Sequence, residues 1–174
     1  MVRTVYPLLS VTVLSACVGS GVPHYFPVPE DAENPIKVEY AGATVPDVTN
    51  LVAKVCSDAG VSARQVLPDE GYVETRWADI AGLDLGSQAE LYPPNERSVI
   101  YVFQATATVY NAGVLQIAGF YQPNRPRGTS PASDARYDRL LPTDHLGYQF
   151  ALQLEWRLKQ EFAKSGITVI SDEQ

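Results

Sequence analysis

Cysteine and histidine, which serve most often as nucleophile and as general acid or base near neutral pH, are few in this sequence. Its 174 residues include two cysteines, Cys17 and Cys56, and two histidines, His24 and His145. A metal site needs several converging ligands and a catalytic triad needs a base with an orienting group, whereas His145 has only Asp144 beside it. No phosphate-binding glycine loop, HExxH, CxxC or nucleophile-elbow motif occurs. We expect no enzyme, no catalytic residue, no metal and no cofactor, although two carboxylates brought together by the fold, as in glycosidases, would leave no local motif.

Cys17 stands in a context that predicts a defined modification. A basic start with Arg3 precedes an apolar run at residues 5–14, which is well short of the roughly 20 residues that span a bilayer. This order is typical of a cleaved signal peptide, here residues 1–16. The residues Leu14-Ser15-Ala16-Cys17 resemble the lipobox of bacterial lipoproteins.

The lipobox resemblance implies that Cys17 becomes the first residue of the mature protein. It would carry diacylglycerol on its sulfur and a third acyl chain, such as palmitate, on its amine, and such chains hold a protein at a membrane permanently. Val18 follows in place of Asp, which in enteric bacteria implies sorting to the outer membrane of the cell envelope, here on the periplasmic side. The alternative is an ordinary secretory signal that leaves Cys17 free to pair with Cys56.

Residues 17–35 form a proline-rich segment between the lipidation site and the domain. Proline at this spacing favours polyproline II, a semi-rigid tether of about 3 Å per residue. Tyr25 and Phe26, with His24, could dock on the domain or on a partner; alternatively they touch lipid headgroups or nothing.

A second candidate site is the long stretch at residues 122–142, which is rich in proline and arginine on an otherwise acidic chain. A loop of this length in a compact domain is usually functional or disordered. It could dock an acidic partner or phosphate groups, because arginine makes bidentate contacts. The alternative is a solvated loop whose Asp134 and Asp138 offset part of the charge. The candidate partner-binding residues are Arg125, Arg127, Arg136, Tyr137 and Arg139.

Composition limits the function classes further. The formal net charge is −7 and the isoelectric point is near 4.7, so the basic footprint of a nucleic-acid binder is missing. Two cysteines are too few for a disulfide framework. The length fits one domain, here residues 36–174.

The first elements of this domain follow from periodicity. Alternation from Ile36 predicts a strand, and a helix follows with Thr44 and Asp47 as a capping box and Gly60 at its end. Cys56 belongs to its apolar stripe, where a thiol is more often packing than nucleophile. That stripe comprises Val48, Leu51, Val52, Val55, Cys56 and Ala59.

Two strands are expected next, at residues 61–67 and 71–80. In the second, Val73, Thr75 and Trp77 share the buried face, while Glu74 and Arg76 share the wet face and could form a weak exposed pair.

The order from Ile36 to Trp77, with Asp69, Gly71 and Thr75 before the tryptophan, resembles the repeated domain of the C-type lipoprotein of the outer-membrane β-barrel assembly machinery. The resemblance covers about a quarter of the chain. It implies a fold, an envelope location and a scaffold role, and it transfers no catalytic residue.

A hairpin turning at residues 111–113 and a final helix complete the domain. Odd positions from Val99 to Val109 are expected to face the core, with Ala105 and Ala107 leaving room for the helix at Leu146–Lys164. Thr143 or Asp144 would be its N-cap, Gly166 would follow it, and residues 167–170 would form a last strand. The expected fold is α+β, an antiparallel sheet of four to six strands with two helices packed on one face.

These patterns favour an outer-membrane-anchored lipoprotein that acts as a non-enzymatic scaffold or accessory subunit of an envelope protein complex. Its expected partners are the membrane, through the lipid anchor, and an envelope protein. The alternative is a periplasmic lipoprotein that binds a small apolar ligand or lipid in a cavity between helices and sheet.

Overall fold

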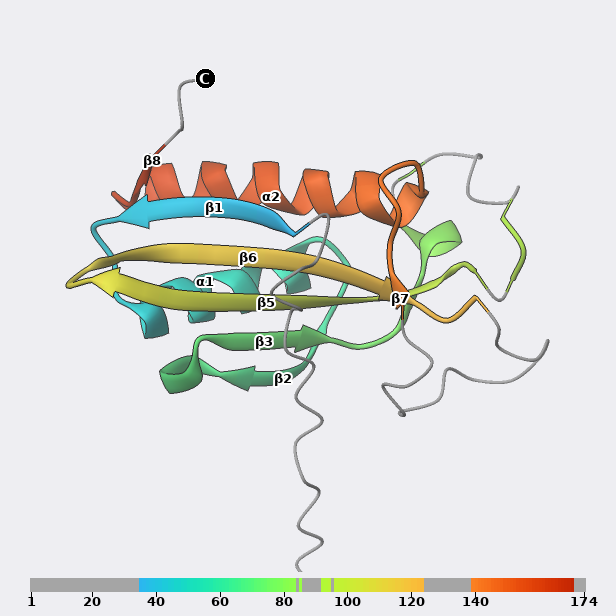
Figure 1. Ribbon diagram of the computed structural model, residues 1–174, viewed down its shortest axis with the longest axis horizontal. Helices are drawn as coiled ribbons and strands as arrows, with labels where there is room; N and C mark the ends of the chain where they lie inside the picture. The colour runs from blue at the N-terminus through green and yellow to red at the C-terminus, as the bar shows by residue number, and fades with distance from the viewer. Residues whose placement is uncertain (1–34, 84, 86–91, 95, 124–138, 171–174) are drawn as a thin grey trace, which may run out of the picture.

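The computed structural model describes residues 35–83, 85, 92–94, 96–123 and 139–170. They form an antiparallel sheet with two helices, α1 (Val45–Asp58) and α2 (Leu146–Lys164), on one face (Figure 1). The eight strands are β1 (Ile36–Ala41), β2 (Ala63–Leu67), β3 (Tyr72–Thr75), β4 (Ala78–Asp79), β5 (Ser98–Val109), β6 (Ala112–Tyr121), β7 (Arg139–Leu140) and β8 (Thr168–Ile170).

The sheet order is β2-β3-β5-β6-β1-β8, with β4 added to β5 and β7 added to β6. The predicted α+β class with two helices on one face is confirmed. The strand count exceeds the expected four to six because β4 and β7, of two residues each, extend the sheet at its margin. β7 lies inside the stretch that the sequence predicted to be loop.

Helix α1 begins and ends as its sequence predicts. The Thr44 side chain accepts from the Asp47 amide, the Asp47 carboxylate accepts from the Thr44 amide, and Gly60 follows at a φ of 83°. Val48, Val52, Val55 and Cys56 are buried, whereas Leu51 and Ala59 at the margin of the stripe are only half-buried.

Strand β5 is buried on both faces in its first half. Val99, Tyr101, Phe103 and Ala105 face the helices, and Ile100 and Val102 pack on the opposite side. The expectation that Ala107 and Val109 also face the core is wrong, because this end of the strand passes beyond the helices and both residues are exposed.

The helix over β5 also differs from the expectation. α1 packs on β5, while α2 lies mainly on β6 and β1 and reaches β5 at Tyr101.

Strand β3 is shorter and more buried than the alternation of apolar and polar residues predicts. It ends at Thr75, so Trp77 does not share the face of Val73 and packs on the opposite side of the sheet. Glu74 lies on the expected wet face and is nevertheless fully buried. Its partner is Arg64 on β2, not Arg76, which is exposed.

The side of the sheet opposite α1 and α2, the helix-free face, carries a second apolar cluster. Figure 1 views this face, with α1 behind the sheet. The second cluster consists of the buried residues Tyr72, Ile100, Val102, Ala118 and Phe120, with Leu67, Trp77 and Leu140 packed against them. Within the described ranges, no helix combines the length and hydropathy needed to cross a membrane.

Candidate functional site

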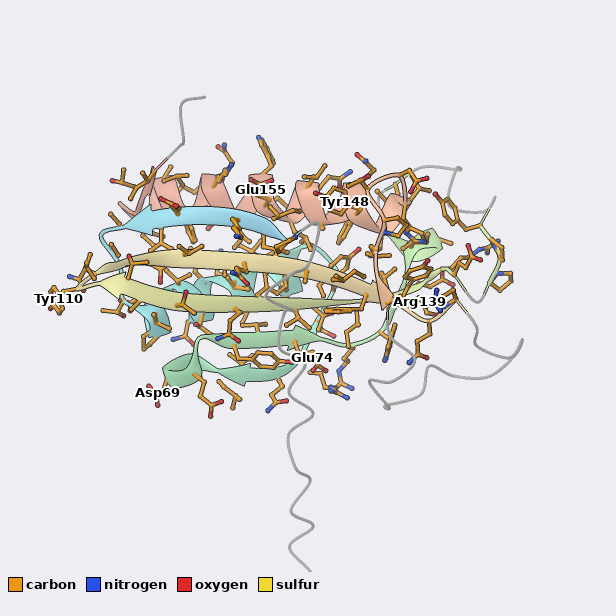
Figure 2. All side chains as sticks on the ribbon, viewed as in Figure 1. Asp69, Glu74, Tyr110, Arg139, Tyr148 and Glu155 are labelled. Atoms are coloured by element: carbon orange, nitrogen blue, oxygen red, sulfur yellow. The ribbon has the colours of Figure 1, made fainter. Side chains whose placement is uncertain are left out.

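Most of the predicted site residues lie outside the described part of the chain. These are the lipidation site Cys17 and the partner-binding candidates Arg125, Arg127, Arg136 and Tyr137. Arg139 is described: it begins β7, lies opposite Tyr121 of β6, and is exposed (Figure 2). The structure therefore places one predicted arginine on the surface, at the end of the sheet where β6 stops.

His145 lies at the same end of the sheet and caps α2. Its Nδ1 accepts a hydrogen bond from the Gly147 amide at 2.9 Å. The expectation that Thr143 or Asp144 caps the helix is therefore wrong. Both are exposed, whereas His145 is buried.

Aromatic rings enclose the His145 imidazole. The ring of Tyr92 lies 4.7 Å away and that of Tyr121 lies 5.2 Å away, centroid to centroid. Burial lowers the pKa of His145 below its usual 6.5, and the backbone and charge of Glu96, with the charge of Asp144, act in the opposite direction. A neutral ring whose Nδ1 accepts a hydrogen bond carries its proton on Nε2. This imidazole is held as a structural cap, and Nδ1 is not open to act as a general base.

Cys56 lies in the main core, as its place in the α1 stripe predicts. Its side chain is fully buried, and burial raises the pKa of the thiol to about 12. A thiol that stays protonated is a poor nucleophile. A bond between Cys17 and Cys56 would require the partner sulfur to reach into this core.

A buried polar group that the sequence did not reveal joins β2 and β3. The Glu74 carboxylate pairs with the Arg64 guanidinium and accepts a hydrogen bond of 2.7 Å from the Tyr72 hydroxyl. The exposed fraction of the side chain is 0% for Glu74 and 33% for Arg64. These contacts link β2 to β3, and removing one partner of such a buried pair is destabilising because it leaves a buried charge.

The outer face of α2 offers a surface of a different kind. Trp156 is 63% exposed and Leu152, one turn earlier, is 37% exposed. Trp156 borders a groove of about 280 Å³ between the helices, the α1–α2 groove, which is lined by Val55, Asp58, Trp156, Arg157, Gln160, Glu161 and Lys164.

Ion pairs fix the sides of this groove. The Lys54 ammonium of α1 contacts the Glu161 carboxylate of α2 at 3.1 Å and the Asp58 carboxylate at 3.3 Å. Lys164 binds the same Glu161. The two helices that form the groove are therefore linked by the Lys54–Glu161 ion pair.

A larger surface groove, of about 450 Å³, lies near the turn after β1. It is lined by Gly42, Ala43, Asp47, Asn50, Leu51, Lys54, Ser165 and Ile167. None of the described residues that line it is aromatic, and Asp47 is already held in the capping box of α1. Among the described residues, no group of three histidine, cysteine or carboxylate side chains is placed to hold a metal ion.

No protein-family model matches this chain, and no curated protein matches its sequence.

Proposed function

We propose that this protein is a bacterial lipoprotein, anchored through acylated Cys17 on the periplasmic side of the outer membrane. Its domain acts as a non-enzymatic scaffold or accessory subunit of an envelope protein complex. The anchor rests on the N-terminal sequence, in which a basic start, a short apolar run and Leu14-Ser15-Ala16-Cys17 follow one another.

The observation that carries the scaffold role is the exposed Trp156 at the α1–α2 groove. Tryptophan is enriched among the residues that dominate binding energy at protein interfaces. Here it has an apolar neighbour in Leu152 and lies at a groove formed by both helices. The groove also offers Arg157, a second residue type that interfaces favour.

The packing of the core supports a scaffold over a carrier of small apolar ligands. Binding a small apolar ligand or lipid would need an enclosed space. Between helices and sheet in the described chain, large side chains such as Tyr101, Phe103, Phe150 and Phe162 fill the interior.

The anchor is tested by mass and by location. The mature protein should carry the mass of diacylglycerol and one further acyl chain on a chain that begins at Cys17. The Cys17→Ser variant should leave the membrane fraction. An unlipidated mature mass would overturn the anchor.

The scaffold role is tested by a photoreactive residue at position 152 in intact cells, with the same residue at Tyr110, on the hairpin between β5 and β6, as the control. We expect position 152 to cross-link to one envelope protein, and we expect the additional change Trp156→Ser to abolish that product. A third probe replaces Arg139; cross-linking from that position and not from position 152 would move the docking site to the arginine-rich stretch. Purification of this protein with a bound apolar small molecule, and without an envelope protein, would favour the ligand-binding alternative.

A further inference from the structure

The helix-free face of the sheet carries apolar side chains that are buried although neither α1 nor α2 packs on this side. The five central residues of the second cluster are at most 7% exposed, and three further apolar side chains pack against them. A sheet face stays out of water only when another layer packs on it, so these buried side chains need a cover.

On β5 and β6 the cluster is confined to one half of this face, whereas on β3 its member Tyr72 lies opposite Gln104. Ile100 lies opposite Phe120 and Val102 lies opposite Ala118, whereas one step further along the strands Gln104 lies opposite Gln116. On β1, Lys37 continues this polar row. The cover must therefore lie over β3, β5 and the second half of β6, not over the whole sheet.

The chain that precedes β1 starts beside this patch. β1 pairs with β6 from Ile36 opposite Ile117, so the continued register brings Pro35 beside Ala118. Ala118 in turn lies opposite Val102, and Val102 lies opposite Glu74. A segment that left Pro35 backwards along this row would cross the second cluster and arrive at the Arg64–Glu74 pair.

The distances suit a segment of modest length. Crossing from β1 to β3 takes three strand spacings of about 4.8 Å each. An extended chain advances about 3 Å per residue. Five residues therefore suffice for the crossing, and the side chains at positions 25–28 reach any part of the cluster without full extension.

Composition distinguishes this segment from the others outside the described ranges. Residues 22–28 contain Val22, Tyr25, Phe26 and Val28. By contrast, residues 124–138 contain one large apolar or aromatic side chain, Tyr137, and residues 86–91 contain one, Leu91. Residues 5–14 are apolar too, but they belong to the expected signal peptide.

We propose that residues 22–34 fold back across the helix-free face, with Tyr25, Phe26 and Val28 packed on the second cluster. The acidic residues Glu30, Asp31 and Glu33 then lie between this contact and β1, where Lys37 is exposed on the same face. The segment thus serves as the missing layer of the domain and not only as a tether. This inference does not depend on the scaffold role; it rests on the proposed anchor only for the removal of residues 1–16 and the recovery of the protein from membranes.

A photoreactive benzoylphenylalanine in place of Phe26, in the full protein purified from membranes in detergent, tests the contact. We expect irradiation to link position 26 to peptides from β3, β5 or β6 of the same chain. Mixing protein with natural and heavy nitrogen before irradiation distinguishes these products from links between two copies. Links only to a second copy or to other proteins, or no links at all, would overturn the proposal.

Thermal unfolding supplies a second, independent readout. The double variant Tyr25→Ser/Phe26→Ser should lower the unfolding temperature by several degrees, because it uncovers the second cluster. Tyr110→Ser is the matched control, since Tyr110 is 91% exposed on the hairpin after β5 and its loss should leave the temperature unchanged. Equal unfolding temperatures for the wild type and the double variant would count against the proposed contact.

Discussion

The guanidinium of Arg64 pairs with the carboxylate of Glu74, whose side chain is fully buried on the helix-free face of the sheet. Removing the arginine leaves this charge without its counter-ion in a place that water does not reach. We expect Arg64→Met to lower the free energy of unfolding by about 3 kcal/mol, the low end for a broken buried pair, because Arg64 is itself partly exposed. Urea unfolding measures the loss.

Arg76→Met is the control for that experiment. Arg76 lies on the same segment of chain, is exposed, and should change the free energy by no more than about 0.5 kcal/mol. If Arg64→Met and Arg76→Met had the same free energy of unfolding, the Arg64–Glu74 pair would not contribute to stability.

His145 makes stability depend on pH. Its pKa is lowered in the folded protein, so below the usual value of 6.5 the unfolded chain takes up the proton more readily. Stability is therefore complete above about pH 6.5 and falls as the pH drops towards and through the folded pKa. Protonation also removes the Nδ1 lone pair that caps α2.

His145→Asn keeps a side-chain acceptor for the helix cap and cannot titrate. We expect the difference in unfolding free energy between pH 7.5 and pH 5.5 to be smaller in this variant than in the wild type. Identical pH profiles would show that another group is responsible.

Cys56 should not react with thiol reagents while the domain is folded. With a pKa of about 12 and full burial, its thiolate is scarce and shielded at pH 8. In a chain carrying Cys17→Ser, we expect Ellman's reagent to react with one thiol only after denaturant is added. The added change Ser57→Cys is the control, because Ser57 is the exposed neighbour on the same helix and should react at once.

Alanine substitutions at Gly71 and Gly60 distinguish the two destabilising effects of an added methyl group, backbone strain and steric overlap. Both have positive φ, 70° and 83°, so alanine at either position meets the left-handed strain of about 1–2 kcal/mol. At Gly71 the new Cβ would also overlap the Ala105 carbonyl oxygen, while at Gly60 the space is open. The unfolding temperature of Gly71→Ala should therefore be clearly lower than that of Gly60→Ala. Similar unfolding temperatures would mean that the backbone of β5 shifts to accommodate the methyl group.

The sequence predicts the helices better than the strands, for a physical reason. The α1 capping box and the α2 repeat of Phe150, Leu154, Leu158 and Phe162 are local signals, and both helices lie within a residue of the expected ends. The faces of β3 and β5 depend on what covers the sheet on each side. Alternation alone indicated one wet face, and so it misassigned Glu74 and Trp77.

The His145 cap and the Arg64–Glu74 pair could not be predicted for a related reason. Histidine is seldom an N-cap, and Thr143 and Asp144 are the stronger local candidates. His145 is selected because Tyr92 and Tyr121 converge on it from distant parts of the chain. The register of β2 on β3, which brings Gln65 opposite Glu74, likewise depends on the whole hairpin.

The β5–β6 hairpin extends beyond both helices, and its residues 106–110 are exposed at the end of the sheet opposite Arg139 (Figure 2). Neither apolar cluster includes any of these residues. An epitope or fluorescent label inserted after Tyr110 would thus leave both sides of the sheet and the α1–α2 groove intact. The tip of the β5–β6 hairpin is therefore a suitable site for a label used to image the protein in living cells.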